Sequence, residues 1–396
     1  MNDTEALILV LNCGSSSIKF ALFPADSLPR QAPWSGKVEG ITGPAPRWDE
    51  TGLASTPLTL DPAQPYHAAL DHIRARVLAR LGGRRLAAIA HRVVHGGSRY
   101  SAPVRLDAAV LADLRSFIPL APLHQPFALE AIELLLQARP ELPQVACFDT
   151  AFHHSLPLVE QLLPLPYAAW ERGLRRYGFH GLSYEYMAVA LAERHGAAAQ
   201  GRSLVAHLGS GASLCAMQGL QSVATTMGFS ALDGLMMGTR CGAIDPGALL
   251  YLMEIEQRSL AEVGHLLYHE SGLLGVSGIA ADPRELLRVE AQEPRAQAAL
   301  ALYVRRIVRE IGALVAVLGG LDLLVFTAGI GEHNAELRRR ICAELGFLDL
   351  RLDAEANTRH APLISAADSR VGVAVEPTNE EWVAARHAAR LLDGPG

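Results

Sequence analysis

The stretch that decides the fold is Asn12-Cys13-Gly14-Ser15-Ser16-Ser17-Ile18-Lys19. It stands between two apolar runs, Ala6–Leu11 and Phe20–Phe23, which predicts a strand, a tight loop of small residues and a second strand. Backbone N–H groups and hydroxyls of such a loop can close around a phosphate group. Only two of the 35 basic residues are lysines, Lys19 and Lys37, so Lys19 is a candidate charge for phosphates. The competing interpretation is an ordinary Gly/Ser turn, which usually binds nothing.

A second copy of this pattern is Val205-Ala206-His207-Leu208-Gly209-Ser210-Gly211-Ala212-Ser213-Leu214. An apolar run again enters a Gly/Ser loop, and another apolar run leaves it. Gly14 and Gly209 lie about half of the 396-residue chain apart. The repeat predicts two related halves, each of which offers one phosphate loop.

A third glycine-rich segment follows a strand candidate near the carboxyl end. The apolar run Leu321–Phe326 leads into Thr327-Ala328-Gly329-Ile330-Gly331-Glu332-His333-Asn334, which we expect to be a turn before a helix over Ala335–Glu344. A glycine-rich turn between a strand and a helix suits a nucleotide. None of the three segments matches the common signature G-x-x-x-x-G-K-[ST].

Composition limits the class of protein. A chain of 396 residues, half of them hydrophobic, predicts two domains with large cores, and a boundary near residue 150 is expected. A net charge of −6 with scattered basic residues argues against nucleic acid as a partner. Five cysteines without a C-x-x-C pair favour the reducing cytoplasm. The start of the chain has no basic region typical of a secretory signal, and Gly319-Gly320 and Asp322 interrupt the one apolar stretch that resembles a membrane span.

Apolar periodicity predicts alternating helices and strands, and hence α/β layers. The prolines between Pro24 and Pro65 favour turns and short edge strands. The expected helices are Tyr66–Leu81, Phe127–Ala138, Tyr184–Arg194, one after the cap Asp245-Pro246, and the long Gln297–Leu318; the expected strands include Leu86–Val94, Val145–Phe148 and Val371–Val375.

Several side chains at predicted strand ends or glycine-flanked loops could carry chemistry. Arg92 ends a strand and could hold a carboxylate or phosphate by two parallel hydrogen bonds, or form a structural ion pair. Asp149 ends the next strand and suits metal organisation or acid–base work, or the capping of a turn. His180 and Arg240 could stabilise a developing negative charge, although a lone histidine is more often structural.

Two further acidic positions have alternative interpretations. Asp282 and Arg284 could grip adenosine or form a simple loop salt bridge. Glu380, in Asn379-Glu380-Glu381, could lie at a Mg²⁺ ion or simply begin the last helix, where acidic residues are favoured.

Taken together, these motifs resemble the acetate kinase family along nearly the full chain, within the larger acetate/sugar kinase, Hsp70 and actin fold group. The resemblance rests on Asn12–Lys19, His91–Gly97, Phe148–His153, Arg176–Gly181, His207–Gly211, Met237–Gly242, Ser277–Arg284, Phe326–Glu332 and Thr378–Glu381. It implies a duplicated ribonuclease-H-like (actin-like ATPase) α/β fold with two domains around a central nucleotide cleft. The first would span residues 1–150, with the C-terminal helix of about 381–396 packed on it, and the second residues 151–380. A homodimer is expected.

The resemblance also implies a role for each site residue, in direct in-line transfer from ATP to acetate. Asn12 and Glu380 would organise Mg²⁺, with Mn²⁺ as an alternative, and Lys19 would meet the ATP phosphates. Arg92 would hold the acetate carboxylate, Asp149 would be the catalytic acidic residue, and His180 and Arg240 would stabilise the transition state. The methyl pocket would be lined by Val94, Leu123, Phe179 and Ala231. The nucleotide would be bound by His207, Leu208, Gly209, Ser210, Gly211, Asp282, Pro283, Arg284, Gly329, Ile330, Gly331, Glu332 and His333.

Four positions depart from the family pattern. Ser210 and His333 each replace a usual Asn, and Ala243 replaces a frequent Asp, so GTP or pyrophosphate preference is open. Ala231 replaces a usual Pro, which predicts use of propionate because the pocket gains room for a methylene group. Alternative functions are a propionate or short-chain fatty-acid kinase, a sugar kinase, and a non-catalytic actin-like or Hsp70-like ATP-binding protein. Arg92, His180 and Arg240 together favour the carboxylate kinase.

Overall fold

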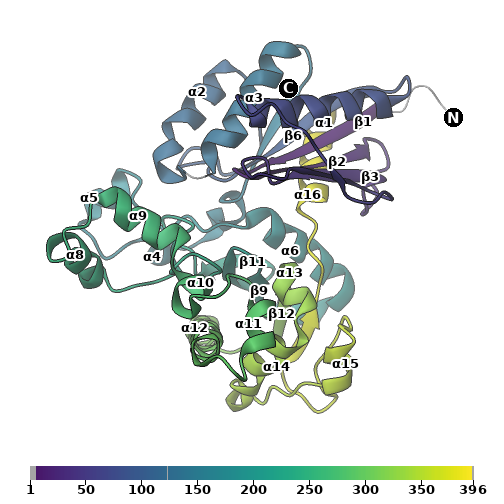
Figure 1. Ribbon diagram of the computed structural model, residues 1–396. Helices are drawn as coiled ribbons and strands as arrows, with labels where there is room; N and C mark the ends of the chain where they lie inside the picture. Colours follow the sequence, from purple (N-terminus) through teal and green to yellow (C-terminus); the bar gives the residue numbers. More distant parts are fainter. Residues whose placement is uncertain (1–5, 123, 395–396) are drawn as a thin grey trace. The chain divides into compact units, whose positions relative to one another are not determined.

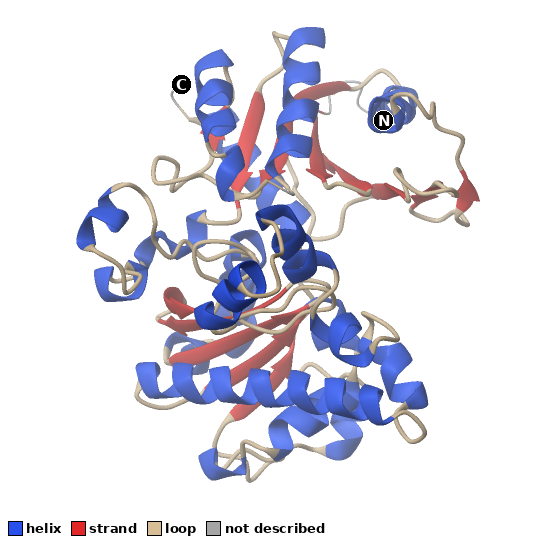
Figure 2. Ribbon diagram, turned by 60° about the vertical axis from the view of Figure 1, so that its left-hand side comes forward, coloured by secondary structure: helices blue, strands red, loops and turns tan. Residues whose placement is uncertain are grey.

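The computed structural model describes residues 6–122 and 124–394. The chain divides into two compact units, and each of them is built on its own sheet (Figures 1 and 2). Unit 1 comprises Met1–Ala151 and Asn379–Gly396, and unit 2 comprises Phe152–Thr378. The two segments of unit 1 are distant in sequence, because the last helix returns to the amino-terminal sheet.

The sheet of unit 1 has the strand order β5-β4-β3-β2-β1-β6-β8-β7. The predicted hairpin forms, with β1 antiparallel to β2 and the loop Gly14–Ser16 between them. β6 runs parallel to β1, and β8 runs parallel to β6. The strand bounds are β1 Ala6–Cys13, β2 Ser17–Pro24, β3 Trp34–Glu39, β4 Arg47–Glu50, β5 Thr56–Pro57, β6 Arg85–Val93, β7 Val104–Arg105 and β8 Gln144–Phe148. The proline-rich region forms short strands toward one edge, as predicted.

Helices complete the core of unit 1. Helix α1 (Pro65–Leu81) packs Ala69, Ile73 and Val77 against the β1 and β2 side chains. Helix α16 (Glu380–Asp393) lies against β1, β6 and β8. The remaining helices are α2 (Ala108–Ser116) and α3 (Gln125–Ala138). Burial of these apolar faces, at roughly 25 cal/mol per Å², holds the unit together.

Unit 2 repeats the topology of unit 1. Its sheet order is β11-β10-β9-β12-β13, with β9 antiparallel to β10 and parallel to β12, and β12 parallel to β13. The corresponding part of unit 1, β3-β2-β1-β6-β8, has the same directions. The bounds are β9 Arg202–Leu208, β10 Ala212–Gln218, β11 Gln221–Thr225, β12 Leu323–Thr327 and β13 Gly372–Val375. The duplication inferred from the two Gly/Ser loops is therefore confirmed.

Helix α12 (Pro294–Leu318) runs along one face of the second sheet (Figures 1 and 2). Its predicted apolar stripe is buried, and Gly319 ends it in a left-handed conformation with φ 69°. The other helices of unit 2 are α4 Leu158–Gln161, α5 Tyr167–Glu171, α6 Gly181–His195, α7 Ala197–Gln200, α8 Pro246–Glu254, α9 Leu260–His269, α10 Gly272–Ser277, α11 Pro283–Val289, α13 Ala328–His333, α14 Ala335–Ala343 and α15 Ala354–Thr358. No described helix is long and apolar enough to cross a membrane.

Three sequence predictions about local structure differ from the structure. Helix α12 begins at Pro294, three residues before the predicted Gln297. The segment after β12 is a short helix, α13, and not a glycine-rich turn. Its carbonyl groups are held by a buried arginine, Arg338, which stabilises helical backbone despite the glycines. Helix α6 begins at Gly181, three residues before the predicted Tyr184, because His180 takes the left-handed cap conformation with φ 59°.

Candidate active site

The carboxyl ends of three parallel strands in unit 1 bring polar side chains together. Asn12 lies near the end of β1, Arg92 near the end of β6, and Asp149 directly after β8. Helix α16 adds Glu380 at its first turn, with Asn379 as its N-cap. Parallel strands end at the same edge of a sheet, where α/β proteins bind ligands. We call these four residues, Asn12, Arg92, Asp149 and Glu380, the acceptor cluster.

Arg92 is the centre of the acceptor cluster. Its Nε donates to both oxygens of Asp149 at 2.9 and 3.1 Å, and its Nη2 donates to Oδ2 at 2.5 Å. Its Nη1 donates to Asn12 Oδ1 at 3.2 Å, and Glu380 Oε2 lies 3.9 Å from Nε. The ion pair considered as the alternative for Arg92 is therefore present. A guanidinium has five N–H donors, so these contacts leave two of them for a further acceptor.

The electrostatics of the acceptor cluster favour an additional cation. Asp149 is only 1% exposed. Burial raises the pKa of Glu380 to about 7; Arg92 opposes that rise, whereas the charge of Asp149 adds to it. Burial lowers the pKa of Arg92, but Asp149 and Glu380 more than compensate and raise it above its usual value. Two carboxylates thus share one guanidinium at a buried position.

Lys19 lies beside this cluster on β2. It is opposite Asn12 in the β1–β2 register and is exposed. It lines a groove of about 410 Å³ together with Asn379 and Glu381. The lysine therefore belongs to strand β2 rather than to the loop, where it remains accessible to an anionic ligand.

In unit 2, three predicted residues converge on the loop Gly209–Gly211. A Cβ atom added to Gly211 would lie 3.2 Å from both His180 Nε2 and Arg240 Nη2. A Cβ added to Gly209 would lie 3.9 Å from His207 Nε2. The His180 and His207 rings stack with centroids 4.1 Å apart and an interplanar angle of 14°. We call His180 and His207 the histidine pair. The Nε2 atoms of both rings and the guanidinium of Arg240 face the glycine loop.

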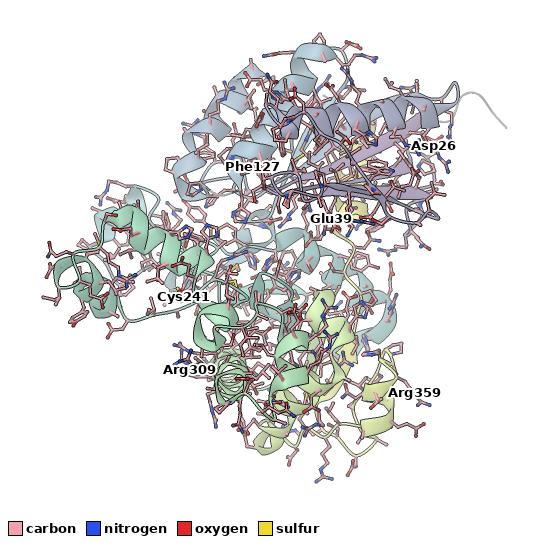
Figure 3. All side chains as sticks on the ribbon, in the orientation of Figure 1. Asp26, Glu39, Phe127, Cys241, Arg309 and Arg359 are labelled. Atoms are coloured by element: carbon pink, nitrogen blue, oxygen red, sulfur yellow. The ribbon has the colours of Figure 1, made fainter. Side chains whose placement is uncertain are left out.

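Arg240 is tied to a loop that carries a predicted pocket residue. Its Nη1 donates to the carbonyl oxygen of Ala231 at 2.8 Å. Cys241 follows it, half-buried (Figure 3). Phe179 is 2% exposed, and its carbonyl accepts a hydrogen bond from His153 Nε2 at 2.9 Å. Val94 lies after β6 in unit 1, Phe179 and Ala231 lie in unit 2, and Leu123 lies outside the described residues, so the four-residue methyl pocket stays a prediction.

The predicted adenosine segments are the starts of two helices. Asp282 caps α11 by accepting from Arg284 N at 2.8 Å, and its carboxylate also pairs with the Arg284 guanidinium at 2.5 Å. Pro283 is the first residue of that helix. The segment Gly329–His333 lies in α13, where Glu332 Oε1 accepts from Thr378 N at 3.2 Å. The side chain of Arg284 is largely exposed and is accessible to a ligand.

Similarity to known proteins identifies the family of this chain. The family model described as the acetokinase family matches residues 7–386. An acetate kinase of Rhodopseudomonas palustris is 50% identical over 396 residues, covering 98% of this chain and 99% of that protein. The chain belongs to the acetokinase family. An acetate kinase of Nitrobacter hamburgensis is 48% identical over 97% of this chain and 96% of its own length.

Solved structures confirm the fold class of this acetokinase family member. A propionate kinase from Francisella tularensis matches with a TM-score of 0.90 at 35% identity, covering 96% of this chain and 98% of that one. The acetate kinase of Porphyromonas gingivalis matches with a TM-score of 0.86 at 34% identity, covering 98% and 100%. The mixed α/β, two-domain actin-like ATPase fold is thus the fold of this chain.

The acceptor cluster also fits the metal ion that the resemblance implies. The described residues contain no group of three or more His, Cys, Asp and Glu side chains arranged for a metal ion. Mg²⁺ needs fewer, because it keeps several waters and usually takes one or two carboxylates together with substrate phosphates. Burial, together with the charges of Asp149 and Glu381, raises the pKa of Glu380, and a nearby cation would favour its ionised form. Glu380 and Asn12 therefore fit as oxygen ligands of a phosphate-bound Mg²⁺.

Sequence reasoning missed a buried arginine that supports the nucleotide segment. Arg338 is 1% exposed and donates to the carbonyls of Gly331 and Glu332 at 2.7 and 2.8 Å. It also contacts Asn357 and His360, and burial lowers its pKa to about 10. Three consecutive arginines, Arg338, Arg339 and Arg340, stand in the sequence, and the sequence alone does not indicate which of them is buried. Exposed arginines such as Arg309 and Arg359 are the usual case (Figure 3).

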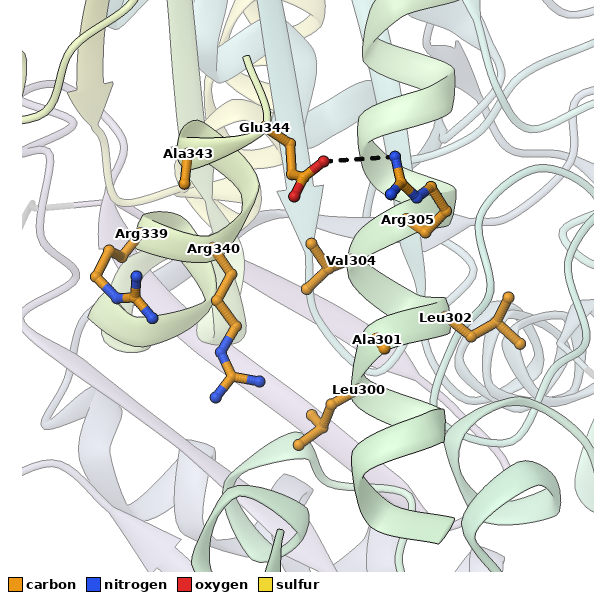
Figure 4. Close-up of a pocket in the computed structure, with 9 residues that line it drawn as sticks. All are labelled: Leu300, Ala301, Leu302, Val304, Arg305, Arg339, Arg340, Ala343 and Glu344. Atoms are coloured by element: carbon orange, nitrogen blue, oxygen red, sulfur yellow. Dashed lines mark ion pairs between the residues drawn. The ribbon is translucent and has the colours of Figure 1, made fainter. Parts of the chain in front are cut away.

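A groove of about 570 Å³ between α12 and α14 is not the candidate site (Figure 4). Its charged side chains are already paired: Arg305 lies 3.4 Å from Glu344, and Arg340 lies 2.7 Å from Glu290. The residues that line it include no predicted site residue. The Arg340–Glu290 pair has a structural consequence, because it connects α14 to the end of α11.

Proposed function

We propose that this acetokinase family member transfers the γ-phosphoryl group of ATP to acetate, reversibly, and forms acetyl phosphate and ADP. The observation that carries the proposal is the acceptor cluster, where Arg92 is held by Asp149 and Asn12 and still has two N–H groups for a carboxylate. A sugar acceptor would instead call for several uncharged donors and acceptors. A non-catalytic ATP-binding protein would have no use for a buried arginine at this strand end.

The reaction is a direct in-line displacement. A carboxylate oxygen of acetate attacks the γ-phosphorus, the bond from that phosphorus to the bridging oxygen breaks, and ADP leaves with the electron pair. The nucleophile is already an anion, so no strong base is required. Positioning and neutralisation of charge supply the rate.

Unit 1 supplies the residues for the acceptor. Arg92 binds the acetate carboxylate, and Asp149 fixes the guanidinium and acts as the catalytic acidic residue. Asn12 and Glu380 hold Mg²⁺, which neutralises phosphate charge when bound, and Mn²⁺ can replace it. Lys19 meets the phosphates from β2.

Unit 2 supplies the residues for the nucleotide. His207–Gly211, Asp282–Arg284 and Gly329–His333 bind ATP, and His180 and Arg240 donate hydrogen bonds to the transferring phosphoryl group. The convergence of His180 Nε2 and Arg240 Nη2 on Gly211 supports this assignment. Ser210 and His333 stand where asparagine is usual, so nucleotide preference should be tested with GTP and pyrophosphate beside ATP.

Ala231, Val94, Leu123 and Phe179 are proposed to set together the size of the acyl group. An alanine leaves room for one more methylene than a proline, an effect worth about 1 kcal/mol. The Francisella tularensis protein, whose structure is similar to that of this chain, is a propionate kinase, and this similarity favours propionate as a second substrate.

We also propose a homodimer in the cytoplasm. Leu250 and Tyr251 of α8, Ile255 directly after it and Leu260 of α9 are each more than half exposed, and the two helices contact one another. An exposed apolar group of this kind is typical of a protein interface. None of the five cysteines forms a disulfide within the part of the chain that the structure describes, which suits a reducing compartment. Sedimentation equilibrium should give a dimer mass, and a monomer at micromolar concentration would contradict the interface.

The activity is tested by trapping acyl phosphate with hydroxylamine. The purified protein is incubated with Mg-ATP, hydroxylamine and acetate, propionate or butyrate, and the acyl hydroxamate is measured. Hydroxamate should form with acetate and, at a lower but measurable rate, with propionate. Absence of hydroxamate with all three acids would refute the function. Propionate activity under about one-thousandth of acetate activity would refute the role of Ala231 while leaving the function intact.

A further inference from the structure

Buried hydroxyl groups stand behind both members of the histidine pair. His180 Nδ1 lies 2.8 Å from Ser213 Oγ, and that hydroxyl lies 2.5 Å from the hydroxyl of Tyr184. His207 Nδ1 lies 2.8 Å from Ser183 Oγ, which accepts a hydrogen bond from Thr378 Oγ1 at 2.8 Å. Each imidazole therefore has a chain of two hydroxyls on its Nδ1 side.

The direction of the first chain follows from hydrogen-bond accounting. Tyr184 is fully buried, and Ser213 is the one hydrogen-bond partner that its hydroxyl has among the described residues. If Ser213 donated to Tyr184, the phenolic proton would be buried without an acceptor, at a cost of about 1–3 kcal/mol. Tyr184 therefore donates to Ser213. The proton of Ser213, itself fully buried, has His180 Nδ1 as its one remaining partner among the described residues, so Ser213 donates to that nitrogen. A nitrogen that accepts at Nδ1 in a neutral imidazole carries its proton on Nε2.

The second chain has the same direction. Ser183 is fully buried and accepts from Thr378, so among the described residues His207 Nδ1 is the one hydrogen-bond partner of its hydroxyl that can take its proton. Leaving that proton without an acceptor would carry the same cost as above, so Ser183 donates to His207 Nδ1. Both rings therefore carry their proton on Nε2. The Nε2 atoms are also the ones that approach Gly211 and Gly209 in the glycine loop. The chains thus present N–H donors, and not lone pairs, on the side where the phosphoryl group is proposed to bind.

We propose that Tyr184 and Ser213 are positioning residues that fix His180 as the Nε2–H tautomer, and that Thr378 and Ser183 do the same for His207. This inference rests on the proposed function. A ring with the opposite tautomer would turn a lone pair toward phosphate oxygens, which repels them. The hydroxyl chains keep each ring in its donor state before substrate arrives, so no tautomer exchange is needed during the reaction.

The test combines a spectroscopic and a kinetic readout. The protein is labelled with ¹⁵N-histidine, and long-range ¹H–¹⁵N correlation spectra are recorded at neutral pH for the wild type, Tyr184→Phe and Ser213→Ala, with His180→Gln to assign the signal. Tyr303→Phe is the matched control, since it removes a buried hydroxyl that has no hydrogen-bond partner among the described residues. Rates are measured for all variants, and Tyr184→Phe is also introduced into a His180→Ala background.

The expected wild-type spectrum shows His180 as the Nε2–H tautomer. In Tyr184→Phe and Ser213→Ala, the signals of both tautomers of His180 should appear, and kcat should fall at least about tenfold. This decrease is smaller than the 10²–10³-fold decrease expected when a whole donor is lost. KM for ATP should change less than about threefold, and Ser213→Thr should restore both readouts. In the His180→Ala background, Tyr184→Phe should have no further effect.

An Nδ1–H tautomer in the wild type would overturn the proposal. An unchanged spectrum and kcat in Tyr184→Phe would overturn it as well, even if Ser213→Ala fails to fold. Tyr184→Phe could instead lower kcat by the same factor in the His180→Ala background as in the wild type. That result would overturn the proposal, because it would assign the hydroxyls a structural role. The tautomer is read without substrate, so failure of acetate phosphorylation leaves this result decisive by itself.

Discussion

At the scale of single residues, the site depends on how buried charge is shared. Arg92 was open to two interpretations from sequence, a structural ion pair or a carboxylate-binding group. The structure shows the ion pair with Asp149, and the same contacts hold the guanidinium rigidly with donors to spare. Side-chain entropy is then already lost before any ligand binds, which favours tight positioning of an acceptor at the proposed site.

Buried neutral histidines should make the fold sensitive to acid. Burial lowers the pKa of His91 and of His153 from the usual 6.5 to about 4. Between these values the unfolded chain binds protons that the folded chain does not, so stability is fully present above pH 6.5 and falls as the pH drops toward 4. Each histidine contributes about 3 kcal/mol to this loss.

Thermal unfolding between pH 7 and pH 4.5 measures the effect. The Tm should fall with decreasing pH, and His91→Gln, which keeps a polar partner for Gln144, should reduce the slope. The exposed His67→Gln is the control and should leave the slope unchanged. A Tm that stays constant from pH 6.5 to pH 4.5 would show that these side chains are not buried in the neutral form.

At the scale of elements, the sequence predicted the strands and hairpins, but not the features that depend on contacts between residues distant in the chain. The apolar runs around Gly14 and Gly209 predicted both hairpins correctly, because small residues between two apolar runs leave few alternatives. The segment Ala328–His333 was mistaken for a turn, because its helical form depends on Arg338, which comes after it in the chain and is buried by tertiary packing. The hydroxyl chains behind the histidine pair were missed, because Ser183, Ser213 and Thr378 look like ordinary helix, strand and loop residues in sequence.

The connection between α11 and α14 should matter for nucleotide binding. Arg340, in α14, donates to both oxygens of Glu290, directly after α11, at 2.7 Å. This pair ties the helix that begins with the proposed adenosine segment Asp282–Arg284 to the helix that follows the segment Gly329–His333. Arg340→Ala should raise KM for ATP about fivefold or more, corresponding to ~1 kcal/mol, because α11 loses its tie to α14, the helix that follows α13. KM for acetate should not change.

Arg339→Ala is the matched control for this prediction. Arg339 is the neighbouring arginine and pairs with Glu336 on its own helix, so its loss should leave KM for ATP within about twofold. Equal effects of the two substitutions would indicate that general charge, and not the connection to α11, supports ATP binding.

At the scale of the whole molecule, duplication explains the division of tasks. The five-stranded sheet of unit 2 and the corresponding five strands of unit 1 each present the carboxyl ends of parallel strands, and the residues gathered there differ in chemistry. Unit 1 gathers a guanidinium between carboxylates, whereas unit 2 gathers two imidazoles and an arginine at a glycine loop. The proposed role of unit 1 is therefore the acceptor, and that of unit 2 is the nucleotide.

The division of tasks is tested most directly by the steady-state KM values of two arginine variants, one in each unit. Arg92→Ala should raise KM for acetate on the order of tenfold to a hundredfold, because the charge-assisted hydrogen bonds to the carboxylate are lost. The same substitution should change KM for ATP little. Arg284→Ala should do the reverse, and Arg92→Lys should recover only part of the acetate affinity. An Arg92→Ala protein with native Tm that raises KM for ATP and leaves KM for acetate unchanged would contradict the account.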